Sequence, residues 1–112
     1  MADDLNTPHF AMTGHWLYRS YLSYRDGNNP ADGLAYVSYV SGVVDMLVVA
    51  QRTGMKSPII CPPLGLPMRD YLDTVGRHLQ DQPQDLHRHR AFYVLKALEA
   101  RFGCGVAVGG TR

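Results

Sequence analysis

The chain has 112 residues, two cysteines, a formal net charge of +1 and 19% charged residues. This length suits one domain with a single core. A nearly neutral chain provides no strong field, which argues against a nucleic-acid or anionic-membrane partner. The longest apolar run, residues 36–50, is interrupted by Ser38, Ser41 and Asp45. Because a membrane span needs roughly 20 apolar residues, the sequence predicts no membrane segment.

Two helices are predicted in the N-terminal half. Thr13 suits an N-cap, and the first helix extends over residues 14–24. Pro30 opens the second helix, since proline has no N–H to leave unpaired in the first turn, and Gly54 ends it. Apolar residues recur at helical spacing in both, at Leu17, Tyr21 and Tyr24 and then at Leu34, Val37, Val40, Val44, Leu47 and Val48.

A proline-rich crossover and two further helices follow. Prolines within residues 55–67 exclude a regular helix and predict a rigid connection. The third helix begins at Pro67 and ends before Pro83, and the fourth ends at Gly103. Both helices have the same apolar spacing, at Met68, Leu72, Val75 and Leu79 and at Ala91, Leu95, Leu98 and Phe102.

The short polar loop between these helices, residues 82–88, predicts an antiparallel helical hairpin. No strand pair or βαβ unit is found. The sequence therefore predicts an all-α fold, a small bundle of about four main helices in one domain over residues 1–104. A glycine-rich flexible tail is expected at residues 105–112.

The two cysteines flank this hairpin. Cys61 precedes the third helix and Cys104 follows the fourth, and these ends are neighbours in an antiparallel hairpin. The topology favours a disulfide, which would close a loop of about 44 residues and stabilise the fold by on the order of 4 kcal/mol. Two separate reduced thiols, or a catalytic or metal-binding cysteine, are the alternatives that the residues leave open.

Five short segments are spread over most of the chain: GHWLY at 14–18, YVSGVVD at 39–45, CPPLG at 61–65, LQDQP at 79–83 and ALEARFGC at 97–104. In this order and spacing they resemble the Tai/Rap immunity family, the immunity proteins of type VI secretion amidase effectors. Members bind and block a peptidoglycan-cleaving amidase that neighbouring bacteria inject. The resemblance implies a bundle of helices that carries no catalytic activity and no cofactor.

The chain departs from many relatives at a second pair of cysteines. Those positions, one late in the first helix and one early in the second, are here Tyr21 and Tyr36. The resemblance implies that Cys61 and Cys104 are the bridge that the family keeps. A contact between the two tyrosine rings would replace the missing cross-link with apolar burial.

The densest charged cluster is His87-Arg88-His89-Arg90. Two histidines without a third ligand predict no metal site, and a short run without interleaved aromatics is not a nucleic-acid patch. From the residues alone, the cluster is equally well explained as a solvated helix end. The resemblance implies a loop that occludes the effector's cleft, with partner-binding residues Gln82, Gln84, Asp85, His87, Arg88 and His89.

Asp45 lies within a strongly apolar helix, where an unpaired carboxylate would be costly. The sequence therefore predicts a hydrogen-bonding, structural role for it, together with Gly42 of the same family segment. Nothing resembles a nucleophile elbow or a phosphate loop, so no catalytic residue is predicted.

The resemblance implies a periplasmic immunity protein that binds its cognate amidase and acts as a homodimer. Residues 1–6 do not form an export leader, so this location requires that a leader has been removed. A disulfide would agree with an oxidising compartment. The alternatives are a disulfide-stapled helical interaction module of unknown ligand, and a small enzyme that uses a cysteine–histidine pair.

Overall fold

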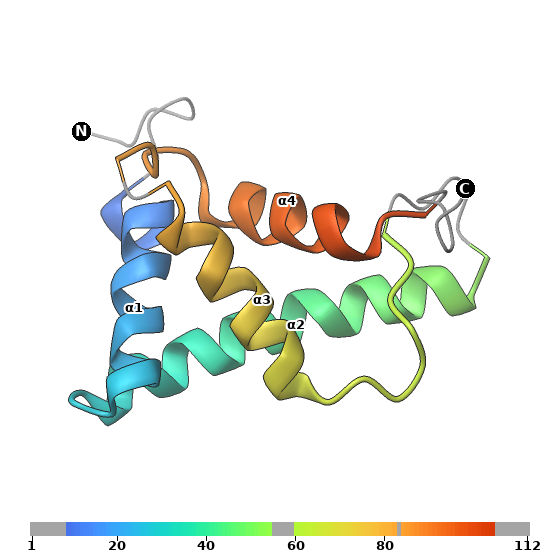
Figure 1. Ribbon diagram of the computed structural model, residues 1–112, viewed down its shortest axis with the longest axis horizontal. Coiled ribbons are helices and arrows are strands. Elements are labelled where there is room, and N and C mark those ends of the chain that lie inside the picture. Colours follow the sequence, from blue (N-terminus) through green and yellow to red (C-terminus); the bar gives the residue numbers. More distant parts are fainter. Residues whose placement is uncertain (1–8, 55–59, 83, 105–112) are drawn as a thin grey trace.

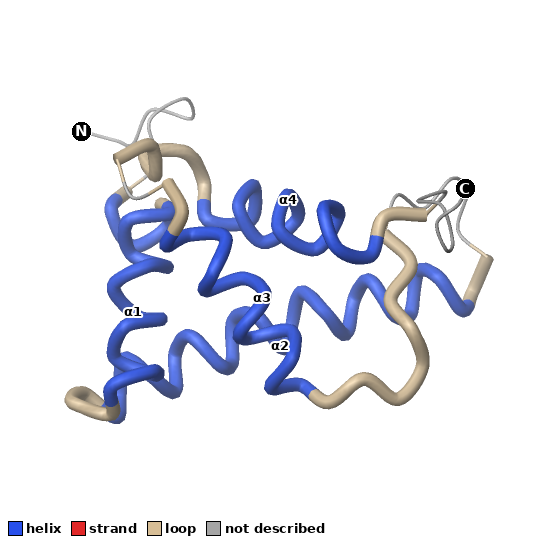
Figure 2. Tube along the Cα trace, in the orientation of Figure 1, coloured by secondary structure: helices blue, strands red, loops and turns tan. Residues whose placement is uncertain are grey.

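Four α-helices and one short 3-10 helix form the computed structural model, and no strand occurs among the described residues (Figures 1 and 2). The structure describes residues 9–54, 60–82 and 84–104. The elements are η1 (Phe10–Met12), α1 (Gly14–Asp26), α2 (Pro30–Arg52), α3 (Met68–Gln80) and α4 (Arg90–Phe102). The predicted all-α bundle of about four helices is confirmed, whereas the predicted flexible tail lies outside the described residues.

The first two helices begin at side-chain caps. The Thr13 hydroxyl accepts a hydrogen bond from the Trp16 N–H at 3.4 Å, and the Asn29 side chain accepts one from the Asp32 N–H at 3.2 Å. These bonds satisfy N–H groups that have no partner within a first helical turn. Helix α1 continues past its predicted end because its left-handed stop is Gly27, with φ of 73°.

The core lies where the four helices meet. Helix α1 stands at one end of the molecule, α2 runs along its length, and α3 and α4 complete the bundle (Figure 1). Helix α1 contacts all three of the others. The apolar side chains with the least exposure come from all four helices and from the segments that connect them, and include Leu17, Tyr36, Val40, Ile60, Val75, Leu79, Leu86, Val94 and Leu98.

The predicted tyrosine contact exists. The ring centroids of Tyr21 in α1 and Tyr36 in α2 lie 5.5 Å apart. The Tyr36 hydroxyl donates to the Leu72 carbonyl of α3 at 2.6 Å, and burial raises the pKa of Tyr36. Gly76 of α3 makes room for the Tyr21 ring, because a Cβ at this position would overlap with the ring. The two tyrosines thereby connect three helices.

The apolar face predicted for α2 is wrong in part. Leu34, expected in the core, has 66% of its surface exposed, whereas Tyr36 is fully buried. The helix is apolar around most of its circumference, so its sequence period does not identify the buried side. By length and composition α2 is also able to cross a membrane, although a core helix or a signal sequence passes the same test.

The predicted disulfide is confirmed. Cys61 and Cys104 are bonded, with their Cα atoms 5.0 Å apart. The Cys61 N–H also donates to the Phe102 carbonyl at 2.7 Å, and Ile60 forms an isolated bridge with Gly103. The crossover therefore starts beside the end of α4 and continues to the start of α3 (Figure 1).

Replacing both Cys61 and Cys104 by alanine should lower the free energy of unfolding by about 4 kcal/mol, because the disulfide restricts the unfolded chain. Urea unfolding measures this difference. Reductant should bring the wild-type protein to the stability of the double variant and leave the variant itself unchanged. A wild-type protein whose stability does not respond to reductant would contradict this account.

Candidate functional site

The loop between α3 and α4, residues 81–89, lies beside the N-terminal end of α1 (Figure 1). The N–H of Gly14 donates to the Arg88 carbonyl and the N–H of His15 to the Leu86 carbonyl, each at 2.9 Å. These are amides of the first turn of α1, which have no acceptor within the helix. The free end of one helix therefore fixes the backbone of the α3–α4 loop.

A buried tyrosine holds the same loop from inside. The Tyr93 hydroxyl accepts a hydrogen bond from the Arg88 N–H at 3.1 Å and donates one to the Asp85 carbonyl at 2.8 Å. Leu86 anchors the loop in the core, where it is fully buried. Gly14 permits this arrangement, because a Cβ there would come within 2.5 Å of the Tyr93 ring. The loop backbone is thus held on two sides.

The side chains of the loop point mostly into solvent. Gln84, Asp85, His87, Arg88 and His89 are all exposed, so five of the six predicted partner-binding residues are available for contact. His87 Nδ1 lies 3.1 Å from an Asp85 carboxylate oxygen. Gln82 differs, because it is partly buried and its side-chain nitrogen lies 3.0 Å from His78 Nε2.

A cation–aromatic stack extends the exposed surface along α4. The Arg88 guanidinium lies 4.9 Å from the Phe92 ring centroid, and the Lys96 ammonium lies 5.9 Å from the same ring. Phe92 is 37% exposed, although its spacing favoured the core. Sequence analysis missed Phe92 and Lys96 as surface candidates. The spacing of Arg88, Phe92 and Lys96, four residues apart, is the signal that could have found them.

Arg90 has a different position from the rest of the charged cluster. Its guanidinium lies 4.1 Å from the Tyr39 ring centroid and 4.8 Å from that of Trp16. Its Nη1 also donates to the Ala11 carbonyl at 3.1 Å. Contacts of a guanidinium with two aromatic faces are favourable. Arg90 therefore joins the start of α4 to α1, α2 and η1.

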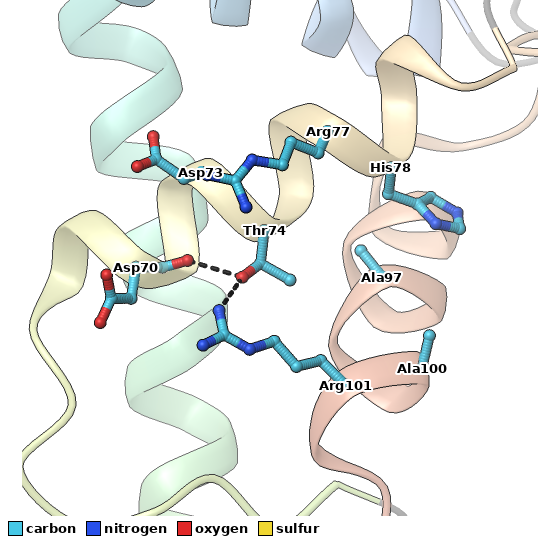
Figure 3. Close-up of a pocket in the computed structure, with 8 residues that line it drawn as sticks. All are labelled: Asp70, Asp73, Thr74, Arg77, His78, Ala97, Ala100 and Arg101. Atoms are coloured by element: carbon cyan, nitrogen blue, oxygen red, sulfur yellow. Dashed lines mark hydrogen bonds between the residues drawn. The ribbon is translucent and has the colours of Figure 1, made fainter.

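A second feature is a groove of about 440 Å³ between α3 and α4 (Figure 3). Thr74 donates to the Asp70 carbonyl at 2.7 Å and accepts from the Arg101 guanidinium at 2.6 Å. The Thr74 hydroxyl is therefore already engaged and is not paired with a base, as a nucleophile would be. Among the described residues, no group of three His, Cys, Asp or Glu side chains is placed to hold a metal ion.

The predicted burial of Asp45 is wrong. Its side chain is exposed at the rim of a groove of about 170 Å³ between α2 and the crossover. No hydrogen bond or ion pair to Asp45 is recorded within the described part of the chain. The carboxylate avoids the cost of burial by facing water, so it needs no internal partner. Gly42 is exposed on the same helix.

Tyr93→Phe should destabilise the protein by about 1–2 kcal/mol, because it removes the partner of one loop N–H and one carbonyl. The Arg88 amide should then exchange with deuterium faster. The matched control is Tyr18→Phe, since the Tyr18 hydroxyl has no hydrogen bond within the described residues. Equal exchange at Arg88 in both variants would show that Tyr93 does not hold the loop.

Burial lowers the pKa of His78 below its usual value of 6.5, and Asp81 partly opposes this shift. Below pH 6.5 the unfolded chain therefore binds more protons at this residue than the folded protein does. The stability contributed by neutral His78 is complete above pH 6.5 and is lost as the pH falls through the folded pKa. We expect His78→Gln to weaken this pH dependence in urea unfolding at pH 7 and pH 5. Parallel pH profiles would contradict it.

Comparison with known proteins agrees with the resemblance seen in the sequence. Residues 13–104 match the model of one protein family, the Rap1a immunity proteins. The match begins at the N-cap of α1, ends at the second cysteine and includes the whole α3–α4 loop. No curated protein and no solved structure matches this chain significantly. The match covers well over half of the chain, which therefore belongs to the family of Rap1a immunity proteins.

Proposed function

We propose that this immunity protein binds a peptidoglycan amidase of a type VI secretion system and occludes its active site with the α3–α4 loop. Membership of the family supports an immunity role toward an effector toxin. The observation that carries the choice of the loop is its construction. Its backbone is hydrogen-bonded to α1 and Tyr93, while its charged side chains remain exposed.

This construction suits inhibition by occlusion. A loop that already has its bound conformation loses little conformational entropy on binding, so more of the contact energy appears as affinity. Arginine and aromatic residues dominate the binding energy of many interfaces, and Arg88 and Phe92 lie side by side here. The protein needs no chemistry of its own, since filling the cleft is sufficient to exclude substrate.

The disulfide supports a periplasmic location. Bonds such as Cys61–Cys104 persist in oxidising compartments, and the periplasm is also where peptidoglycan is accessible to an amidase. We further propose that the protein acts as a homodimer, as the resemblance to the Tai/Rap family implies.

The alternative functions receive less support. Both cysteines of the chain are in the disulfide, so a cysteine–histidine enzyme would lack its thiolate. A helical interaction module with another ligand would have the same fold. It differs in its partner, and only a binding experiment separates it from an amidase inhibitor.

Reversing charge on the loop, with His87→Glu and Arg88→Glu together, should weaken inhibition of the amidase roughly tenfold or more, because the contact surface changes sign. Inhibition is measured as peptidoglycan cleavage against inhibitor concentration. Arg77→Glu is the matched control, since it changes an exposed arginine of α3 away from the loop. If the loop variant inhibits as well as this control, the loop does not make the contact, even if the protein is an amidase inhibitor.

A further inference from the structure

Helix α2 exposes an apolar surface that none of the proposed contacts uses. Leu34 is 66% exposed, Met46 68% and Val49 56%, and only 22% of the most apolar stretch of the helix is buried. Exposed apolar side chains gathered on one element are typical of an interaction site. The core does not need this surface, because α2 contributes Tyr36, Val40 and Val44 from its other side.

The exposed residues lie along one face. Leu34, Ser38, Gly42 and Met46 follow one another at intervals of four, and Val49 comes three residues later. At 3.6 residues per turn, these positions fall on the side of α2 opposite to the buried residues. Asp45 lies on the same side. We name this surface the α2 stripe, made of Leu34, Ser38, Gly42, Asp45, Met46 and Val49.

We propose that the α2 stripe is the surface through which two copies of this chain associate, as an antiparallel helix pair that crosses at Gly42. This inference rests on the homodimer proposed above and names the face that forms it. In a two-fold arrangement centred on Gly42, the same surface serves both copies. Leu34 then lies opposite Val49 of the second copy, and Ser38 lies opposite Asp45.

The pattern of the stripe is self-complementary in this register. Apolar Leu34 faces apolar Val49, while the Ser38 hydroxyl is placed to donate to the Asp45 carboxylate, which has no partner within the described chain. A Cβ built on Gly42 meets no atom within 4 Å, so this position leaves space at the crossing for a second helix to approach closely. Antiparallel helices also place opposite dipole ends together.

Two other occupants fit less well. A bilayer would have to accept the Asp45 carboxylate in the middle of the stripe, which is costly in hydrocarbon. An effector that arrives only during an attack would leave the stripe in water at all other times. A second copy covers it permanently. In Figure 1, α2 crosses the lower part of the molecule while the α3–α4 loop lies at the upper edge, so dimerisation through α2 leaves the loop accessible.

Cysteine cross-linking tests the register, since both native cysteines are already bonded. Oxidised Gly42→Cys should form a covalent dimer, because the two new thiols meet at the crossing. Leu34→Cys should not, whereas the double change Leu34→Cys with Val49→Cys should. Cross-linking of Leu34→Cys alone would indicate a parallel pair and overturn the proposal, as would its absence in both of the others.

Light scattering tests the face itself. Met46→Asp should halve the mass in solution, while Leu64→Asp, which changes a 74% exposed leucine of the crossover, should leave the dimer intact. A Met46→Asp variant that remains dimeric would exclude this face but not the homodimer. A monomeric wild-type protein would exclude the homodimer, and therefore this face. In either case inhibition of the amidase is unaffected if the loop assignment is correct, which separates the two proposals.

Discussion

The free amides at the start of α1 fix how the rest of the molecule is arranged. A helix leaves its first N–H groups without internal acceptors, and here two of them bind the carbonyls of Leu86 and Arg88. A single set of bonds thus completes the end of one helix and holds the loop that joins two others. Gly14 and Tyr93 are required in their positions because the Tyr93 ring lies against the Gly14 backbone.

Helix α4 is held at both ends as a consequence. At its start, Tyr93 binds the loop and Arg90 lies between the rings of Trp16 and Tyr39. At its end, the disulfide to Cys104 joins it to the crossover. A support fixed at both ends presents the α3–α4 loop and the neighbouring Phe92 in one orientation. This rigidity is what an inhibitor that acts by filling a cleft requires.

Much of this fold was predictable from local chemistry. Helix starts followed from Thr13 and Pro30, and the disulfide followed from the positions of the cysteines around a helical hairpin. The attachment of the loop to α1 was not predictable, because bonds between backbone groups leave no mark in the side-chain sequence. The buried face of α2 was also missed. Its apolar residues surround the helix, so neither the exposure of Leu34 nor that of Asp45 could be read from their spacing.

The central claim is that this Rap1a immunity protein neutralises an amidase by direct binding. The most direct test is to titrate it calorimetrically into the effector encoded beside its own gene while following peptidoglycan cleavage. We predict tight binding, with cleavage lost in proportion to the complex formed. Two folded proteins that give neither heat nor inhibition would contradict the account, and would leave a disulfide-bonded helical protein of this family with a different partner.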